Sequence, residues 1–180
     1  MRLINKTVFA GVVLFFMLGI YAYAADSAKI GIVDFRKILE ESNTGKSGRA
    51  EIKKQGEKME ADLKKRGAEL EEIKNKLDKD AMVANKSARD EKEREAQIKY
   101  IDFKNLEKKY ASEIQKLQTD FFIRTKNDVD IIVGEIGKKE GYQIIIEKNQ
   151  AGVFYSPASA DITNRVIQQL NAKTSSKAGK

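Results

Sequence analysis

Cysteine and histidine are absent from the sequence, and proline occurs only once, at position 157. Without cysteine the chain has no disulfide framework and no cysteine for lipid attachment, so packing or assembly must hold it together. Without histidine it lacks the usual general base near neutral pH and the commonest zinc ligand. These absences argue against an enzyme and against a structural zinc site.

The first two dozen residues have the pattern of a secretory signal peptide. Two basic residues lie near the start, residues 8–20 form an apolar run, and residues 22–24 have the small-x-small pattern of a cleavage site. We expect cleavage after Ala24, so that residues 1–24 are removed from an exported chain. An uncleaved membrane anchor is the alternative, because the apolar stretch just reaches the length needed to span, but no positive cluster follows it.

The chain after this leader divides by composition into a body, a long arm and a second part of the body. Residues 29–34 predict a strand with apolar side chains on both faces. Asp34 suits the N-cap of a short helix over residues 35–41. The Ser-Asn-Thr-Gly segment at 42–45 predicts a break after that helix.

The second part of the body predicts more β-structure. Residues 142–147 are rich in β-branched side chains and predict a strand. Residues 148–152 predict a turn and residues 153–156 a return strand, which together make a β-hairpin. Asp161 suits the N-cap of a final helix. The body therefore comprises residues 25–45 and 127–171, followed by a polar, disordered tail over 172–180.

Residues 46–126 predict a long helical hairpin, here called the arm. The segment has no proline and is rich in Glu, Lys, Ala and Leu, which are strong helix formers. Small residues over 81–88 predict a tip where the chain reverses, with about 60 Å of helix on each side. The first helix has a heptad seam with a glycine and an arginine as flaws. The seam positions are Ile52, Met59, Arg66 and Ile73 on one side and Gly56, Leu63, Leu70 and Leu77 on the other.

The body is too small to cover its own apolar strands. Short strands and helices leave apolar side chains on both faces of the sheet. We therefore expect an oligomer in which the body strands of several copies meet and the arms project together. The candidate subunit-interface residues are Ile30, Ile32, Val33, Ile144, Ile145, Ile146, Phe154 and Tyr155.

The arm carries an excess of positive charge, with 22 Lys and Arg against 17 Asp and Glu over residues 46–126. Any single basic cluster is more simply the solvated face of a helix with i,i+4 ion pairs. Several arms together would enclose a basic space that attracts acidic clients or anionic lipid. Methionine suits promiscuous contact surfaces, although apolar residues at a tip also pack across a chain reversal. The candidate client-contact residues are Met59, Lys64, Lys65, Arg66, Met82, Val83, Lys108 and Lys109.

Two short motifs resemble ligand-binding loops and fail on spacing. Gly-Lys-Ser at 45–47 resembles the end of a phosphate-binding loop, but Glu40 stands where that loop needs its first glycine. Residues 78–80 begin like a calcium loop, but apolar residues follow at 82–83, where a ligand and a glycine are needed. No carboxylate is isolated in apolar surroundings, and no serine lies in a nucleophile elbow. The sequence predicts no catalytic residue, no cofactor and no metal site.

Two blocks at the ends of the chain match a known family. The opening block covers residues 29–35, 38–42 and 45–46, and the closing block covers 140–142, 146–149, 153–155 and 161–163. In these blocks, with a helical insertion between them, the chain resembles the Skp/OmpH family of periplasmic chaperones. The resemblance implies a homotrimer with a β-structured body, three helical tentacles around a cavity, and capture of unfolded outer-membrane β-barrel proteins without ATP. Some members have a proposed lipopolysaccharide site among basic tentacle residues, and no residue of this chain is assigned to it.

The expected fold is α+β and mainly α. A long antiparallel coiled-coil hairpin is inserted between the first strand and helix of a small β-rich oligomerisation body and its β-hairpin. The expected function is that of an ATP-independent periplasmic holdase chaperone, not of an enzyme. A structural coiled-coil envelope protein without chaperone activity is the alternative. A nucleic-acid binder, suggested by an isoelectric point near 9.4, is disfavoured because acidic residues interleave with the basic ones and the leader indicates export.

Overall fold

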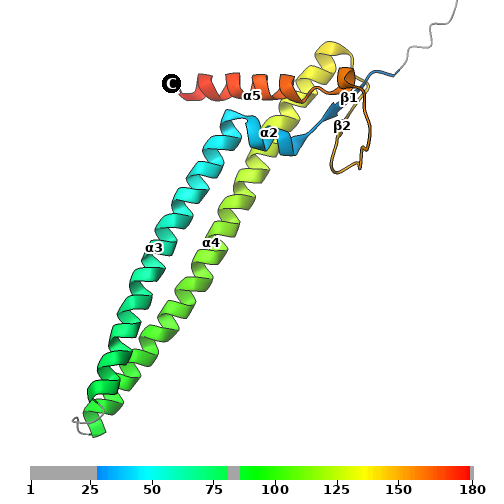
Figure 1. The fold of residues 1–180 in the computed structure, drawn as a ribbon. Coiled ribbons are helices and arrows are strands. Elements are labelled where there is room, and N and C mark those ends of the chain that lie inside the picture. Colours follow the sequence, from blue (N-terminus) through cyan, green and yellow to red (C-terminus); the bar gives the residue numbers. More distant parts are fainter. Residues whose placement is uncertain (1–27, 81–85, 179–180) are drawn as a thin grey trace, which may run out of the picture.

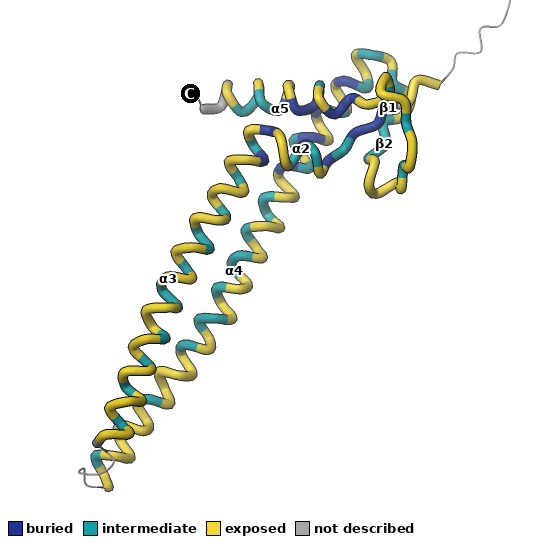
Figure 2. Tube along the Cα trace, in the orientation of Figure 1, coloured by how far each residue is buried: buried dark blue, intermediate teal, exposed yellow. Residues whose placement is uncertain are grey.

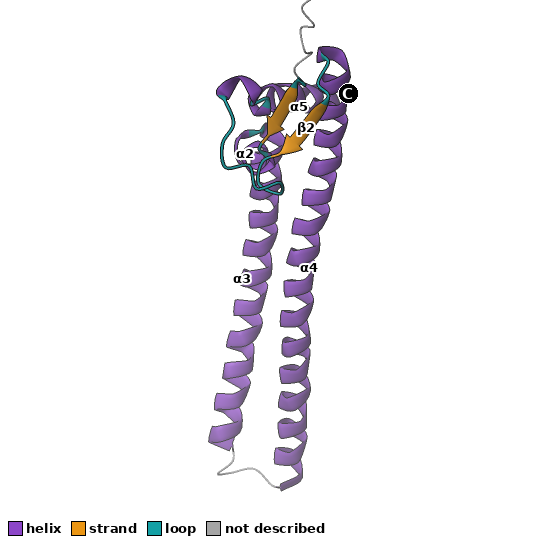
Figure 3. Ribbon diagram, turned by 90° about the vertical axis from the view of Figure 1, so that its right-hand side faces the viewer, coloured by secondary structure: helices purple, strands orange, loops and turns teal. Residues whose placement is uncertain are grey.

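The computed structural model describes residues 28–80 and 86–178 of the chain. The two longest helices lie side by side and antiparallel, as an arm that projects from a smaller body (Figures 1 and 3). The expected mainly helical α+β class with an inserted helical hairpin is confirmed. The elements are β1 (Ile30–Val33), α2 (Phe35–Glu41), α3 (Asn43–Asp80), α4 (Lys86–Glu140), β2 (Ile144–Glu147), the 3-10 helix η1 (Ala158–Ala160) and α5 (Thr163–Ala178).

Two expectations fall outside the described residues. They are the signal peptide over residues 1–24, and the tip residues Met82 and Val83. On the far side of the tip, α4 begins at Lys86, so the predicted reversal over 81–88 is shorter there than expected.

The sheet has two parallel strands that are far apart in sequence. β1 and β2 pair with Ile30 opposite Ile144 and with Val33 opposite Glu147. Parallel strands need a long crossover connection, and here α2 and the whole arm supply it. The two parts of the body are therefore joined by backbone hydrogen bonds across the insertion.

The β-hairpin predicted over residues 142–156 is wrong. After β2 the chain turns, with Gly152 in the left-handed region at φ 63°, and residues 153–156 belong to no strand of the described structure. The edge of β1 away from β2 is instead bridged by Asp161, which lies opposite Ile32. High β propensity correctly indicated the first strand of the expected hairpin, but pairing between distant segments decides which strands form.

The hydrophobic core lies in the body. α2, the last turns of α4 and α5 pack together beside the sheet, and Figure 2 shows that the buried residues gather at this end of the molecule. α4 runs without a break from the arm into the body, where its final turns contribute core side chains. The buried core residues are Val33, Phe35, Ile38, Val129, Ile132, Ile136, Ile162, Val166, Ile167 and Leu170.

A single residue, Ser42, joins α2 to α3. Its backbone N–H donates to the carbonyl of Ile38, and its hydroxyl accepts from the backbone N–H of Gly45 over 3.0 Å. Ser42 therefore ends one helix and caps the next. A Cβ at Gly45 would lie 2.0 Å from the carbonyl oxygen of Leu39, so the two helices meet at a contact that only glycine allows. The predicted break over 42–45 is too long, because three of its residues already belong to α3.

α5 is longer than the sequence predicts. It is capped as expected, since the carboxylate of Asp161 accepts from the backbone N–H of Thr163 over 2.8 Å. The disordered tail predicted over 172–180 is wrong for residues 172–178, which continue this helix. Polar composition alone suggested disorder, but contacts with the arm, described below, give these residues a helical partner.

The arm has a half-buried seam and no core of its own. Of its described residues between 46 and 124, none is buried. The predicted seam of α3 is half-buried at every position except Arg66, which is exposed. Across the described residues, no helix combines the length and the apolar character that crossing a membrane requires.

Candidate functional site

A polar contact, here called the clasp, joins the two arm helices near their middle. Tyr110 of α4 donates to a carboxylate oxygen of Asp62 on α3 over 2.9 Å, and Arg66 donates to the same oxygen over 3.0 Å. Both hydrogen bonds lower the pKa of Asp62, and the bond from Tyr110 has the larger effect. The same bond raises the pKa of Tyr110. The clasp fixes the register of the helices and engages Arg66, a candidate client-contact residue, within the arm.

The heptad pattern did not indicate the clasp. Asp62 stands one position before the seam residue Leu63, where a polar side chain is unremarkable in sequence. The only signal was Tyr110, an aromatic residue with a hydroxyl at a seam position, because such a residue needs a polar partner when it is half-buried.

Between the clasp and the tip the seam is open on both sides. Phe103 of α4 faces Gly67 of α3, where a Cβ would lie 3.9 Å from the phenyl ring. A groove runs along each side of this contact, and Leu70 and Phe103 line both grooves. The rims carry charges of both signs: Arg66, Glu69, Lys99 and Asp102 on one side, and Glu71, Lys74, Glu93 and Lys104 on the other. The distal arm thus presents apolar surface between charged side chains.

The basic clusters of the arm differ in how far they are neutralised. Lys65 and Lys109 form i,i+4 ion pairs with acidic residues one turn later, at 4.0 Å and 3.7 Å. Lys64 and Lys108 make no ion pair within the described part of the chain. Because Tyr110 bonds to Asp62 in an antiparallel pair, Lys64 and Lys108 lie at nearly the same height on the arm. Of the predicted basic contact residues, these two retain the most available charge, while Met59 lies half-buried in the seam.

The body has an exposed apolar rim. Phe154 and Tyr155 in the segment after the turn are 104% and 85% exposed, and Ile144 at the start of β2 is 56% exposed. Ile30 is also exposed, whereas Ile145 and Ile146 are half-buried. Large apolar side chains are therefore left uncovered on this part of the body within one chain.

Two of the predicted interface residues are already covered within one chain. Ile32 and Val33 are only 5% and 6% exposed. Val33 packs in the core, and the bridge to Asp161 brings the chain before α5 against Ile32. The sequence predicts that another subunit covers both residues. In the structure α5 and the segment just before it cover them within the same chain.

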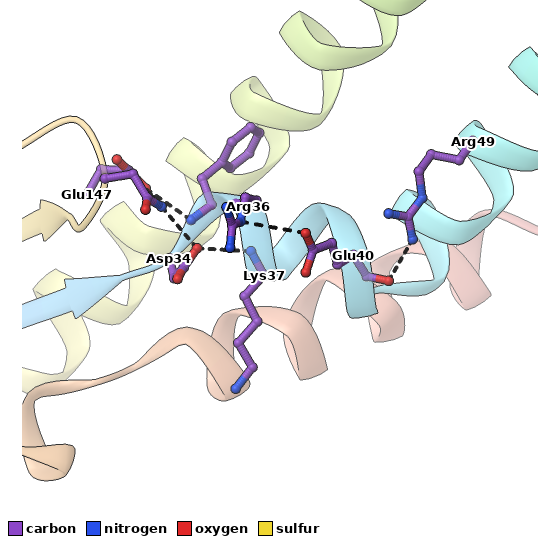
Figure 4. A network of polar contacts seen from close by, with 8 residues as sticks. Asp34, Arg36, Lys37, Glu40, Arg49 and Glu147 are labelled. Atoms are coloured by element: carbon purple, nitrogen blue, oxygen red, sulfur yellow. Dashed lines mark hydrogen bonds and ion pairs between the residues drawn. The ribbon is translucent and has the colours of Figure 1, made fainter.

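Carboxylates at the ends of the two strands hold the body together (Figure 4). Glu147 accepts from the backbone N–H groups of Phe35 and Gln150 over 3.2 Å and 2.6 Å. Asp34 accepts from the backbone N–H of Lys37 over 2.9 Å, as predicted for an N-cap, and from the Asn149 amide over 3.1 Å.

These carboxylates serve structure rather than acid–base chemistry. Burial alone would raise the pKa of Asp34 and of Glu147, but the hydrogen bonds that each accepts outweigh it, so both pKa values are lowered. Both groups stay ionised near neutral pH and lack the raised pKa of a general acid. Within the described ranges no group of three or more acidic side chains is arranged to hold a metal ion.

Comparisons with known proteins agree with this architecture. Residues 29–170 match the family model for outer membrane protein (OmpH-like). The chain is 31% identical over 149 residues to the chaperone protein Skp of Blochmanniella pennsylvanica, covering 79% of this chain and 85% of that protein. It shares its fold with an outer membrane chaperone (OmpH-like) of Caulobacter crescentus, with a TM-score of 0.75 at 16% identity, covering 81% of this chain and 85% of that one. Since the family match spans both parts of the body and the arm between them, the chain belongs to the OmpH-like family.

Proposed function

We propose that this protein is a periplasmic holdase chaperone that captures unfolded outer-membrane β-barrel proteins between its arms without ATP. The observation that carries the proposal is that the arm has no buried residue among its described positions between 46 and 124. It nevertheless has an apolar seam, which two grooves open. Such a surface suits contact with another chain better than self-stabilisation. A family that includes a chaperone of similar length supports this role.

The arm offers many weak contacts rather than one tight site. The strands of an unfolded outer-membrane protein alternate apolar and polar side chains, and they aggregate when left uncovered. The grooves around Leu70 and Phe103 take apolar side chains, while Lys64 and Lys108 attract acidic ones. Because no single contact is strong, release follows when the client pairs its strands elsewhere, and no nucleotide is needed.

Association of the bodies supplies the cavity. We propose a homotrimer in which the exposed rim of Ile30, Ile144, Phe154 and Tyr155 is buried between subunits. Each large apolar side chain removed from water contributes about 1.5–3 kcal/mol. The three arms then surround a space with a net positive lining, which also favours anionic lipid or lipopolysaccharide at its surface. Export by the signal peptide over residues 1–24, with cleavage after Ala24, places this assembly in the periplasm.

Light scattering from a urea-unfolded porin diluted into buffer tests the proposal. The mature chain should suppress aggregation without ATP, and suppression should weaken with added salt because exposed charges are screened. The double substitution Lys64→Gln and Lys108→Gln should reduce both the suppression and its salt dependence. The matched control, Lys65→Gln with Lys109→Gln, removes the same formal charge from cations that are already paired, and its effect should be smaller.

Two results would contradict the proposal. Full aggregation of the porin in the presence of the folded chain would favour a structural envelope protein. Equal capture by the two double variants at every salt concentration would remove the role given to Lys64 and Lys108.

A further inference from the structure

The second half of α5 lies against the root of the arm. Leu170 is the last core residue of this helix, at 1% exposure, yet α5 continues to Ala178. In Figure 1 this continuation extends away from the sheet, over the upper ends of α2 and α3. The residues that follow the core therefore lie where the arm leaves the body.

Asn171 and Thr174 hold the first turn of α3. The side-chain oxygen of Asn171 accepts from the backbone N–H of Asn43 over 2.8 Å. That N–H lies in the first turn of a helix, where backbone donors have no carbonyl partner in their own helix. The hydroxyls of Thr44 and Thr174 lie 2.8 Å apart, and because Thr174 donates to its own helix over 2.8 Å, Thr44 donates to Thr174.

Lys173 holds the other arm helix. Its ammonium group lies 2.7 Å from the carboxylate of Asp128 on α4, and both side chains are about one-third exposed, at 35% and 33%. An ion pair this close and partly covered restrains position better than a fully exposed pair. Within four residues, α5 thus contacts both helices of the arm.

Other contacts at this point join α3 to α2 and to α4. Gly45 packs on the Leu39 carbonyl of α2, Arg49 donates to the Glu40 carbonyl over 2.8 Å (Figure 4), and Gly48 packs against Phe121 of α4. None of these three contacts involves α5, so the contacts of residues 171–174 are what link α3 and α4 to that helix here. We propose that residues 171–174 of α5, here called the root clamp, set the angle between the arm and the body of one chain. This inference holds whatever the oligomeric state, and it stands whether or not the arm holds clients.

The length of the arm makes a small change at the root measurable. Glu71 lies about 42 Å along α3 from Asn43, at 1.5 Å per residue, so a rotation of about 10° moves it by about 7 Å. The chain contains no cysteine, so spin labels can be placed at will. Glu71→Cys on the arm and Lys148→Cys on the body are both at exposed positions. Refolding with an excess of unlabelled chain restricts the measured distances to label pairs within one chain.

Pulsed electron paramagnetic resonance on this labelled pair tests the root clamp. The variant Asn171→Ala with Thr174→Val removes both contacts with α3, and we expect its distance distribution to broaden and shift by several ångströms. The matched control, Gln168→Ala with Gln169→Ala, changes two exposed residues of the same helix and should superimpose on the parent. Faster amide hydrogen exchange at Asn43 and Thr44, by severalfold, should accompany the shift in the clamp variant alone.

A distribution for the clamp variant that superimposes on the parent would overturn the inference. If the clamp variant loses helical circular dichroism, the milder Lys173→Gln is measured in its place. Lys173→Gln removes the ion pair with Asp128, and it should broaden the same distribution. A parent-like distribution for a folded Lys173→Gln would then contradict the proposal.

Discussion

Alanine in place of Gly67 should stiffen the arm, whereas alanine in place of Gly48 should not. Both glycines lie on α3, and both face a phenylalanine of α4. At Gly67 a Cβ would lie 3.9 Å from the Phe103 ring, which is ordinary van der Waals contact. At Gly48 it would lie 2.1 Å from the Phe121 ring, so the ring or the helix must move. The same glycine-to-alanine substitution is therefore expected to have different effects at the two positions, because the facing ring is close to the added Cβ only at Gly48.

The magnitudes follow from helix propensity and packing. Glycine to alanine within a helix gains about 1 kcal/mol, which slows local opening about fivefold. At Gly67 nothing opposes this gain. At Gly48 the same gain competes with an overpacking cost of about 1–3 kcal/mol, which leaves the root unchanged or destabilised by up to about 2 kcal/mol.

Amide hydrogen exchange along α3 measures both effects. Gly67→Ala should slow exchange in the distal arm about fivefold, while Gly48→Ala should leave exchange at the root unchanged or faster. Gly134→Ala on α4 is the control. Apart from its chain neighbours and the nearby backbone of its own helix, no atom lies within 4 Å of its added Cβ, so it reports helix propensity alone. Equal protection by Gly48→Ala and Gly67→Ala would refute this account of how α3 packs on α4.

Three further predictions concern the clasp, the carboxylates and the rim. The pKa of Tyr110 is raised above its ordinary value of 10.0, so its hydrogen bond to Asp62 stabilises the arm below pH 10.0. This stabilisation is lost as the pH rises through the raised pKa, and amide hydrogen exchange in the arm should then become faster. Tyr110→Phe should abolish this alkaline change. Asp34 and Glu147 have lowered pKa values, so their carboxylates stabilise the body above pH 3.8 and pH 4.5, and this stabilisation is lost as the pH falls through the lowered values. The melting temperature of the double variant Asp34→Asn with Glu147→Gln should therefore depend less on acid pH than that of the parent. Replacing Phe154 and Tyr155 by serine should shift the assembly toward monomer at unchanged helical circular dichroism, and an unaltered mass by scattering would count against the proposed interface.

The helical architecture could be predicted from sequence because its signals are local. Strong helix formers without proline, a heptad seam and the N-cap at Asp34 each act within a few residues, and the structure has each of them. The insertion was indicated by the change in composition on either side of the arm.

The parts that could not be predicted depend on contacts between distant segments. Residues 153–156 have the composition of a strand, but β2 pairs with β1 across the whole arm. Residues 172–178 are polar, yet contacts with α3 and α4 support them as helix. The clasp joins Asp62 to Tyr110 across 48 positions, and a single sequence does not indicate which acidic residue of α3 faces that hydroxyl.

The central claim is that associated bodies hold arms around an unfolded client. Light scattering coupled to size-exclusion chromatography, on the mature chain with and without urea-unfolded porin, tests it most directly. The account predicts the mass of three chains alone and a soluble complex heavier by the mass of the captured client, without nucleotide. A stable monomer at micromolar concentration that leaves the porin to aggregate would contradict it.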